Sequence, residues 1–201
     1  MKTYPVVLSI AGSDCSGGAG IQADIKTISA LGAYAASVIT AVTVQNTRGV
    51  KAVHTVPAEI VQGQIEAVME DLRPDALKIG MVSEPALVKI IAGCLLKYPL
   101  CPIVYDPVMV STSGRKLMAK DAIQLIKEEL FPLTSLITPN LDETEVLTGK
   151  KITTAEEMKE AARQLSEEYH TAVLVKGGHL EGNEMQDVDR KSTRLNSSHE
   201  E

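Results

Sequence analysis

Apolar runs alternate with segments of helical period along this chain. Runs rich in Val, Ile and Leu are typical of buried strands, whereas apolar residues that recur every three or four positions predict helices. The expected strands are residues 6–10, 36–44, 75–82, 103–108, 135–138 and 172–176. The expected helices are residues 21–31, one that begins near Pro57, one capped by Ser83, residues 119–130, and one capped by Thr153 or Thr154 that runs to about Glu168.

This alternation predicts an α/β fold built from right-handed βαβ units. Such units form a mostly parallel central sheet with helices on both faces. Residues 46–56 break the pattern, because Gly49 lies between two short stretches, and there we expect a hairpin or edge flap. Ligands of parallel sheets bind beyond the carboxyl ends of the strands. Polar residues that follow the strands are therefore the candidate site.

Composition and charge limit the number of domains, the partners and the location that we expect for this protein. The 201 residues are 44% apolar and 23% charged, which suits one globular domain. A net charge of -6 offers no general attraction to nucleic acid or anionic membranes, so we expect neither as a partner. The first apolar run breaks at Gly12, too early for a membrane span or export signal. Three cysteines without C-x-x-C spacing favour neither disulfides nor zinc, and a cytoplasmic location is expected.

The glycine-rich segment AGSDCSGGAG, residues 11–20, lies directly between the first strand and the first helix. Its glycines allow a ligand to approach the backbone closely. It lacks the lysine of a P-loop and the spacing of a dinucleotide-binding loop, which excludes both of these nucleotide motifs. A tight strand-to-helix turn explains the same residues equally well.

Two polar residues near this loop could recognise a heteroaromatic ring that carries an amine. Asp24 falls in the first turns of the first helix, and Gln45 ends the second strand. A glutamine amide both donates and accepts hydrogen bonds. The alternatives are a solvated carboxylate at a helix start and an ordinary turn residue. Met81, after the third strand, could pack on such a ring or fill the core.

Residues after the later strands suit phosphate and metal binding. Asp106 ends the fourth strand, and Asn140 and Glu143 share one face at a helix start, where they could hold hydrated Mg²⁺. Lys176 precedes two glycines and could contact triphosphate oxygens. A structural aspartate and a helix cap are the alternative explanations.

Taken in order, six segments resemble the hydroxymethylpyrimidine and phosphomethylpyrimidine kinases of thiamine biosynthesis, within the ribokinase-like superfamily. The segments are AGSDCSGGAGIQADIKT, SVITAVTVQNTRGV, KIGMV, DPVM, LITPNLDE and VLVKGGH. The resemblance implies a ribokinase-like fold and phosphorylation of 4-amino-5-hydroxymethyl-2-methylpyrimidine, and then of its monophosphate, with ATP and Mg²⁺. The implied substrate contacts are Gly12, Asp24, Gln45, Met81 and Val108. The implied ATP contacts are Asp106, Asn140, Glu143 and Lys176, the first three of which would also hold Mg²⁺.

The same resemblance implies a later glycine-rich segment that carries a Cys or Asp base, and no such segment follows Asp187. We therefore expect no catalytic base in this chain, an incomplete kinase domain over residues 1–188, a non-native or disordered tail over 189–201, and no turnover by the chain alone. The alternatives are a pyridoxal or pyridoxine kinase and a non-catalytic pyrimidine-binding protein. The uncovered flap edge would suit a homodimer interface.

Overall fold

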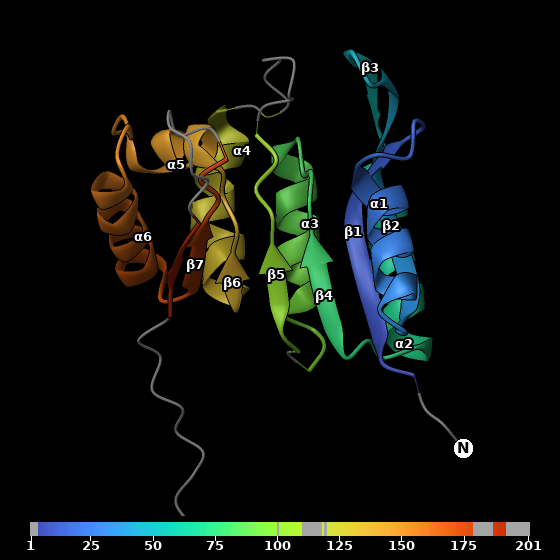
Figure 1. The fold of residues 1–201 in the computed structure, drawn as a ribbon. Coiled ribbons are helices and arrows are strands. Elements are labelled where there is room, and N and C mark those ends of the chain that lie inside the picture. The colour runs from blue at the N-terminus through green and yellow to red at the C-terminus, as the bar shows by residue number, and fades with distance from the viewer. Residues whose placement is uncertain (1–3, 100, 110–117, 119, 179–186, 192–201) are drawn as a thin grey trace, which may run out of the picture.

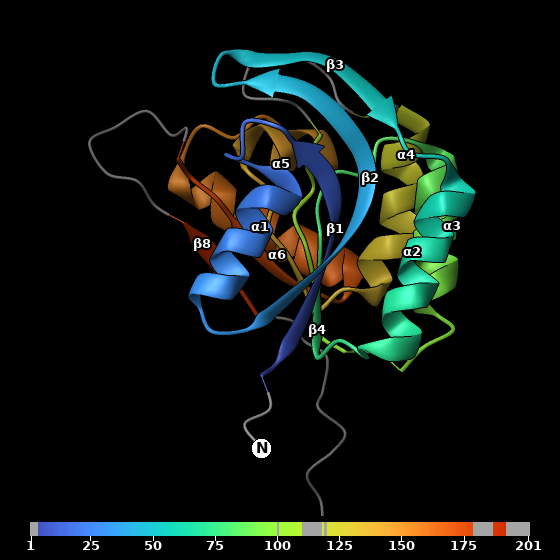
Figure 2. The ribbon, with the colours of Figure 1, turned by 90° about the vertical axis from the view of Figure 1, so that its right-hand side faces the viewer.

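The computed structural model describes residues 4–99, 101–109, 118, 120–178 and 187–191. These residues form one eight-stranded sheet in the order β3-β2-β1-β4-β5-β6-β7-β8 (Figure 1). Helix α1 lies on one face, and α2, α3 and α4 lie on the other (Figure 2). The predicted α/β architecture, a mostly parallel sheet with helices on both faces, is confirmed. None of the described helices is long and apolar enough to span a membrane.

The six parallel strands lie where the apolar runs predict them. They are β1 (Val6–Asp14), β2 (Tyr34–Asn46), β4 (Ala76–Ile79), β5 (Ile103–Tyr105), β6 (Leu136–Ile137) and β7 (Ala172–Val175). Their side chains supply much of the core; Leu8, Ile10 and Ile79, for example, are completely buried. Burial on both faces explains why these strands read as nearly unbroken apolar runs.

The helices fill the connections between strands. They are α1 (Gly20–Ala30), α2 (Ala58–Asp71), α3 (Pro85–Leu95), α4 (Lys120–Leu125), α5 (Leu141–Thr148) and α6 (Ala155–Tyr169). After α4 the chain continues as a π-helical turn, Ile126–Leu130. Thr154 and Glu157 form the predicted capping box of α6. The predicted Ser83 cap is wrong, because Glu84 occupies the N-cap position and Pro85 begins the helix.

The predicted flap is the hairpin of β2 and β3 (Gly49–Thr55), which pair antiparallel at one edge of the sheet. At this end β2 leaves Val42 and Val44 about half exposed, at 48% and 56%. The hairpin stands above the carboxyl end of the sheet (Figure 2).

The opposite edge differs from the expectation. Strand β8 (Val188–Arg190) pairs antiparallel with β7, and Leu174 lies opposite Asp189. Asp189 and Arg190, predicted to begin a disordered or non-native tail, are therefore part of the sheet. The remainder of that tail, residues 192–201, lies outside the described residues, and the domain boundary near 188 stays a prediction.

Candidate active site

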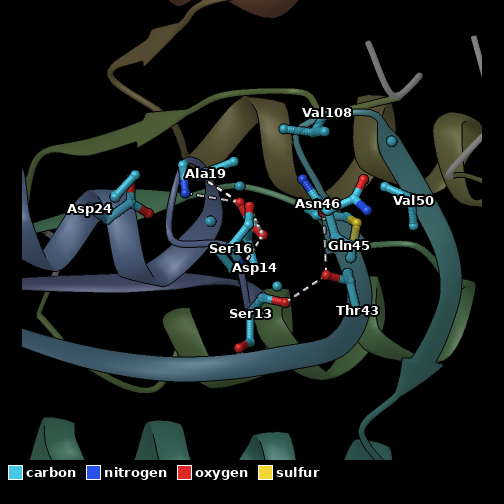
Figure 3. A pocket seen from close by; sticks show the side chains of 18 of the residues that line it. Ser13, Asp14, Ser16, Ala19, Asp24, Thr43, Gln45, Asn46, Val50 and Val108 are labelled. Atoms are coloured by element: carbon cyan, nitrogen blue, oxygen red, sulfur yellow. Dashed lines mark hydrogen bonds between the residues drawn. The ribbon is translucent and has the colours of Figure 1, made fainter. Parts of the chain in front are cut away.

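A cavity of about 630 Å³ opens at the carboxyl ends of β1, β2, β4 and β5 (Figure 3). All five residues predicted to contact a substrate line it, and so does one residue predicted to contact phosphate. They are Gly12, Asp24, Gln45, Met81, Val108 and Asp106. Residues from widely separated parts of the sequence thus face one volume. The volume lies in the range of small-molecule sites.

Asp14 organises the glycine-rich loop that forms one wall of the cavity (Figure 3). Its buried carboxylate accepts hydrogen bonds from the backbone N–H groups of Ser16, Gly18 and Ala19 at 2.8 to 3.0 Å. Burial alone would raise the pKa of Asp14, but the hydrogen bonds from Ser16, Ala19 and Gly18 outweigh it and hold the pKa below its ordinary value. Asp14 was not among the predicted site residues, although an aspartate that precedes small residues in a turn is a known signal.

Two glycines of this loop lie in close contact with neighbouring atoms. Gly20 has a φ of +57°, and a Cβ there would lie 2.2 Å from the Gly12 carbonyl oxygen. A Cβ at Gly12 would lie 2.7 Å from the Met81 Cε atom. Gly20 is therefore required by its positive φ and by its contact with the backbone of Gly12, whereas the contact at Gly12 is with the flexible end of the Met81 side chain.

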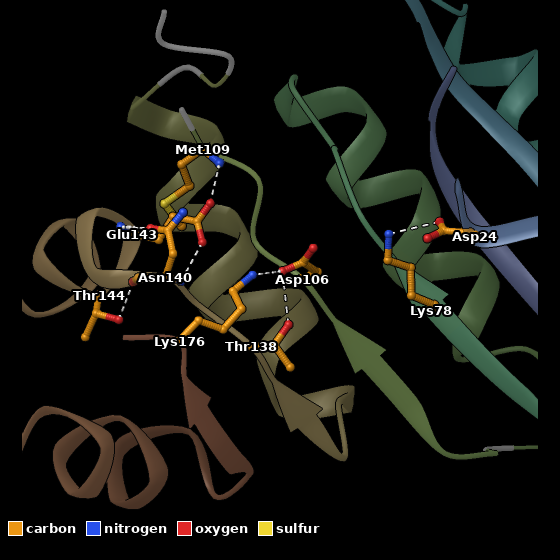
Figure 4. A network of polar contacts seen from close by, with 9 residues as sticks. All are labelled: Asp24, Lys78, Asp106, Met109, Thr138, Asn140, Glu143, Thr144 and Lys176. Atoms are coloured by element: carbon orange, nitrogen blue, oxygen red, sulfur yellow. Dashed lines mark hydrogen bonds and ion pairs between the residues drawn. The ribbon is translucent and has the colours of Figure 1, made fainter. Parts of the chain in front are cut away.

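Asp24 is held by a partner that we did not predict (Figure 4). Its Oδ2 atom accepts from Ser9 Oγ at 2.6 Å and from Lys78 Nζ at 2.9 Å. Lys78 lines the same cavity from β4. A lysine inside the apolar run ALKIGMV was the available signal, because charged residues in buried strands are generally paired. Among the described residues, Asp24 Oδ1 has no hydrogen-bond donor, so that oxygen can accept from a ligand.

Gln45 is tied to the glycine-rich loop by its backbone. The Cys15 thiol donates to the Gln45 carbonyl oxygen at 3.1 Å, and the Gln45 N–H donates to Cys15 Sγ at 3.5 Å. Its side-chain Oε1 atom lies 3.2 Å from Thr43 Oγ1. These contacts hold the Gln45 amide at the cavity wall (Figure 3).

A second network begins at Asp106 and crosses three neighbouring strand ends (Figure 4). Asp106 Oδ1 accepts from Lys176 Nζ at 2.7 Å and from Thr138 Oγ1 at 3.0 Å. Asp106 follows β5, Thr138 follows β6 and Lys176 follows β7. The structure thus brings two of the predicted phosphate residues, Asp106 and Lys176, into direct contact beside the cavity.

Asn140 and Glu143 lie outside the residues that line the cavity and cap α5 instead (Figure 4). Asn140 Oδ1 accepts from the Glu143 N–H at 2.9 Å, and Glu143 Oε2 accepts from the Asn140 N–H at 2.8 Å. The other carboxylate oxygen, Glu143 Oε1, accepts from the Met109 N–H at 3.3 Å. The helix-cap alternative therefore accounts for both side chains, and Asn140 does not line the cavity beside Asp24 and Gln45.

The donor set does not fit a magnesium ion held directly by Asp106, Asn140 and Glu143. Both oxygens of Glu143 and the side-chain oxygen of Asn140 already accept a hydrogen bond from a backbone N–H group, which ties them to the start of α5 and to Met109. No cluster of three or more His, Cys, Asp or Glu side chains suited to a metal occurs in the part of the chain that the structure describes. Asp106 does fit, because its Oδ2 atom has no donor among those residues.

Glu143 makes stability depend on pH. Burial raises its pKa to about 7, against the hydrogen bond from Asn140 and the charge of Lys176. Between pH 4.5 and 7 the folded chain then binds more protons at this carboxyl than the unfolded chain, so stability falls as pH rises. A Glu143→Gln variant does not titrate there. We expect its unfolding free energy to improve relative to the parent by about 3 kcal/mol between pH 4.5 and 8.

Urea denaturation at several pH values measures this difference. The matched control is Glu59→Gln, at an exposed position in the first turn of α2. Its stability relative to the parent should change by less than about 0.5 kcal/mol over the same range. A flat difference for Glu143→Gln would contradict the raised pKa.

A family model described as "Phosphomethylpyrimidine kinase" matches residues 14–199. The chain belongs to the phosphomethylpyrimidine kinase family. It is 54% identical over 186 residues to the hydroxymethylpyrimidine/phosphomethylpyrimidine kinase of Rhizobium meliloti, which covers 91% of this chain and 69% of that relative. Against seven further curated relatives, the chain spans 34% to 65% of their length.

Comparison with solved structures supports the same family assignment. A crystal structure of phosphomethylpyrimidine kinase from Clostridium difficile superposes with a TM-score of 0.86 at 47% identity, covering 95% of this chain and 82% of that one. The pyridoxal kinase of Staphylococcus aureus, solved with AMP-PCP and pyridoxal, gives a TM-score of 0.85 at 29% identity, covering 96% of this chain and 70% of that one. The predicted ribokinase-like fold and kinase family are thereby confirmed.

Proposed function

We propose that this chain binds 4-amino-5-hydroxymethyl-2-methylpyrimidine in the cavity. It would do so as the substrate-binding part of an ATP-dependent kinase that phosphorylates the hydroxymethyl oxygen and then the resulting monophosphate. The observation that carries the proposal is the cavity itself, where Gly12, Asp24, Gln45, Met81 and Val108 come together at the carboxyl edge of the sheet. Curated relatives that bear this kinase name support the choice of substrate.

The side chains suit a small ring with one polar edge. Met81 and Val108 offer apolar atoms on which the ring can pack. The Gln45 amide and the uncommitted Asp24 Oδ1 atom offer hydrogen bonds to an amine and a ring nitrogen. Because Lys78 already neutralises Asp24, the cavity does not demand a cationic ligand. A neutral aminopyrimidine is the ligand class that these groups match.

The neighbouring network suits the phosphates of ATP. Phosphoryl transfer depends mainly on positioning and on neutralising charge. Lys176 places a cation beside the cavity, and its side chain is 39% exposed and accessible to a phosphate. Mg²⁺, when bound, would neutralise phosphate charge, and Asp106 is the residue whose free oxygen could hold it. Asn140 and Glu143 would contribute by holding the start of α5 and the backbone at Met109 in place.

Isothermal titration calorimetry of this chain with the pyrimidine and with pyridoxal tests the proposal. We expect the pyrimidine to bind more tightly, because its amine and ring nitrogen satisfy polar groups that pyridoxal leaves unpaired. Tighter binding of pyridoxal would favour the pyridoxal kinase alternative, and binding of neither ligand would overturn the proposal. A cytoplasmic location and a homodimer stay predictions.

A further inference from the structure

Thr43 lies two residues before Gln45 on β2, and the two side chains contact each other. Thr43 is 6% exposed and lines the cavity. Its Oγ1 atom lies 2.9 Å from the Ser13 carbonyl oxygen and 3.2 Å from Gln45 Oε1 (Figure 3). This hydroxyl thus links the end of β1 to the side chain predicted to recognise the substrate.

One hydroxyl hydrogen cannot serve both oxygens. A threonine hydroxyl donates a single hydrogen and accepts through its lone pairs. The Ser13 carbonyl oxygen can only accept. At 2.9 Å it is also the nearer of the two oxygens, so the Thr43 hydroxyl donates its hydrogen to it. Thr43 Oγ1 can then act toward Gln45 only as an acceptor. An amide oxygen of Gln45 in that position would face the lone pairs of Thr43 Oγ1. An amide nitrogen there would instead donate a hydrogen bond to Thr43 Oγ1.

A half-turn of the Gln45 amide resolves this conflict. It exchanges the oxygen and the nitrogen while the rest of the side chain stays in place. The nitrogen then donates one hydrogen to Thr43, and the oxygen takes the place of an amide nitrogen that has no partner among the described residues. With the hydrogen trans to the amide oxygen bonded to Thr43, the second N–H, cis to that oxygen, remains available. The amide then presents an acceptor and a donor side by side.

We propose that Thr43 is a positioning residue that fixes the direction of the Gln45 amide and so selects a ring that carries an amine next to a ring nitrogen. The inference rests on the proposed function and deepens it. An aminopyrimidine donates from its amine and accepts at the adjacent nitrogen, which matches the fixed amide. The corresponding 4-oxo ring accepts at its carbonyl oxygen and donates from the adjacent N–H. It matches only the reversed amide, which Thr43 disfavours.

NMR of the ligand-free chain tests the amide direction without any assumption about function. The expected result is a nuclear Overhauser effect between the Gln45 side-chain NH₂ protons and the Thr43 methyl or Hβ protons. In Thr43→Val the Gln45 NH₂ signals should shift, whereas in Thr43→Ser, which keeps the hydroxyl, they should stay near the parent positions. Gln45 NH₂ signals unaffected by Thr43→Val, without that contact, would overturn the inference.

Calorimetry tests the selectivity with two probes, 4-amino-5-hydroxymethyl-2-methylpyrimidine and its 4-oxo analogue. The parent chain and Thr43→Ser should prefer the amino ring about tenfold or more, as a satisfied polar pair allows. Thr43→Val should reduce that preference about fivefold or more, because either amide direction becomes accessible. A folded Thr43→Val chain with the same preference as the parent would contradict the proposed role of Thr43 in selectivity.

The matched control is Thr171→Val. Thr171 is 1% exposed and its hydroxyl donates to the Thr134 carbonyl oxygen at 3.0 Å, so it resembles Thr43 in burial and bonding. It lies outside the residues that line the cavity. Its substitution should leave the ratio of the two affinities unchanged even where stability falls. If the parent binds neither probe, the proposed function fails, while the NMR contact still decides the direction of the amide.

Discussion

Replacing Gly20 with alanine is expected to lower the free energy of unfolding by about 2 to 5 kcal/mol. Gly20 begins α1 with a φ of +57°, which costs a residue with a Cβ about 1 to 2 kcal/mol. The new Cβ would also lie 2.2 Å from the Gly12 carbonyl oxygen, so backbone must move, at a further cost of about 1 to 3 kcal/mol. Because Gly12 packs on Met81, that movement should also impair the cavity.

Urea denaturation followed by circular dichroism measures this loss. Gly63→Ala is the matched control, since Gly63 lies inside α2 and a Cβ there would meet no described atom within 4 Å beyond the helix's own backbone. That control should gain up to about 1 kcal/mol, the usual advantage of alanine over glycine within a helix. Equal stability of Gly20→Ala and the parent would show that the loop adopts another conformation.

Replacing Gln45 with alanine is expected to weaken pyrimidine binding by about 1 to 3 kcal/mol, roughly 5-fold to 150-fold. The substitution removes the side chain that we propose forms hydrogen bonds with the polar edge of the ring. It therefore leaves the ligand's donor and acceptor unpaired. The Cys15 contacts involve only the Gln45 backbone, so they should survive the change. Calorimetry should therefore report a loss of affinity in a chain that remains folded.

Gln124→Ala provides the control for this experiment. Gln124 is exposed on α4, and its amide donates to Glu128 at 2.6 Å, away from the cavity. Its substitution should leave pyrimidine affinity unchanged. Unchanged affinity in Gln45→Ala would remove Gln45 from the substrate site, and with it the selectivity role of Thr43.

Apolar patterning was sufficient to predict the sheet, because its six parallel strands are buried and therefore rich in β-branched residues. The β2–β3 hairpin was predictable from Gly49 and the turn residues around it. Strand β8 was not, because the segment Val188–Arg190 is short and polar and joins the sheet by backbone hydrogen bonds to β7. Pairing through the backbone does not require apolar side chains at a regular spacing, so the sequence carries no pattern that predicts this strand.

The position of a residue at a strand end was the part of the site that sequence could supply. Gln45, Met81 and Asp106 follow parallel strands, whose carboxyl ends meet at one edge, so they share the cavity. The pairing of Asp24 with Lys78, 54 residues apart, depends on which strands are neighbours in the sheet. Asn140 and Glu143 could be assigned to a cap or a metal site from sequence alone, and their hydrogen bonds show a cap.

The cavity at the carboxyl edge of the sheet is the site proposed to bind the pyrimidine. A ¹⁵N-edited NMR titration of the chain with 4-amino-5-hydroxymethyl-2-methylpyrimidine tests it directly. We expect saturable shifts at the backbone amides of Gly12, Gln45 and Met81, with little change along the exposed face of α6. An absence of shifts at saturating ligand, or shifts confined to residues outside the cavity, would contradict it.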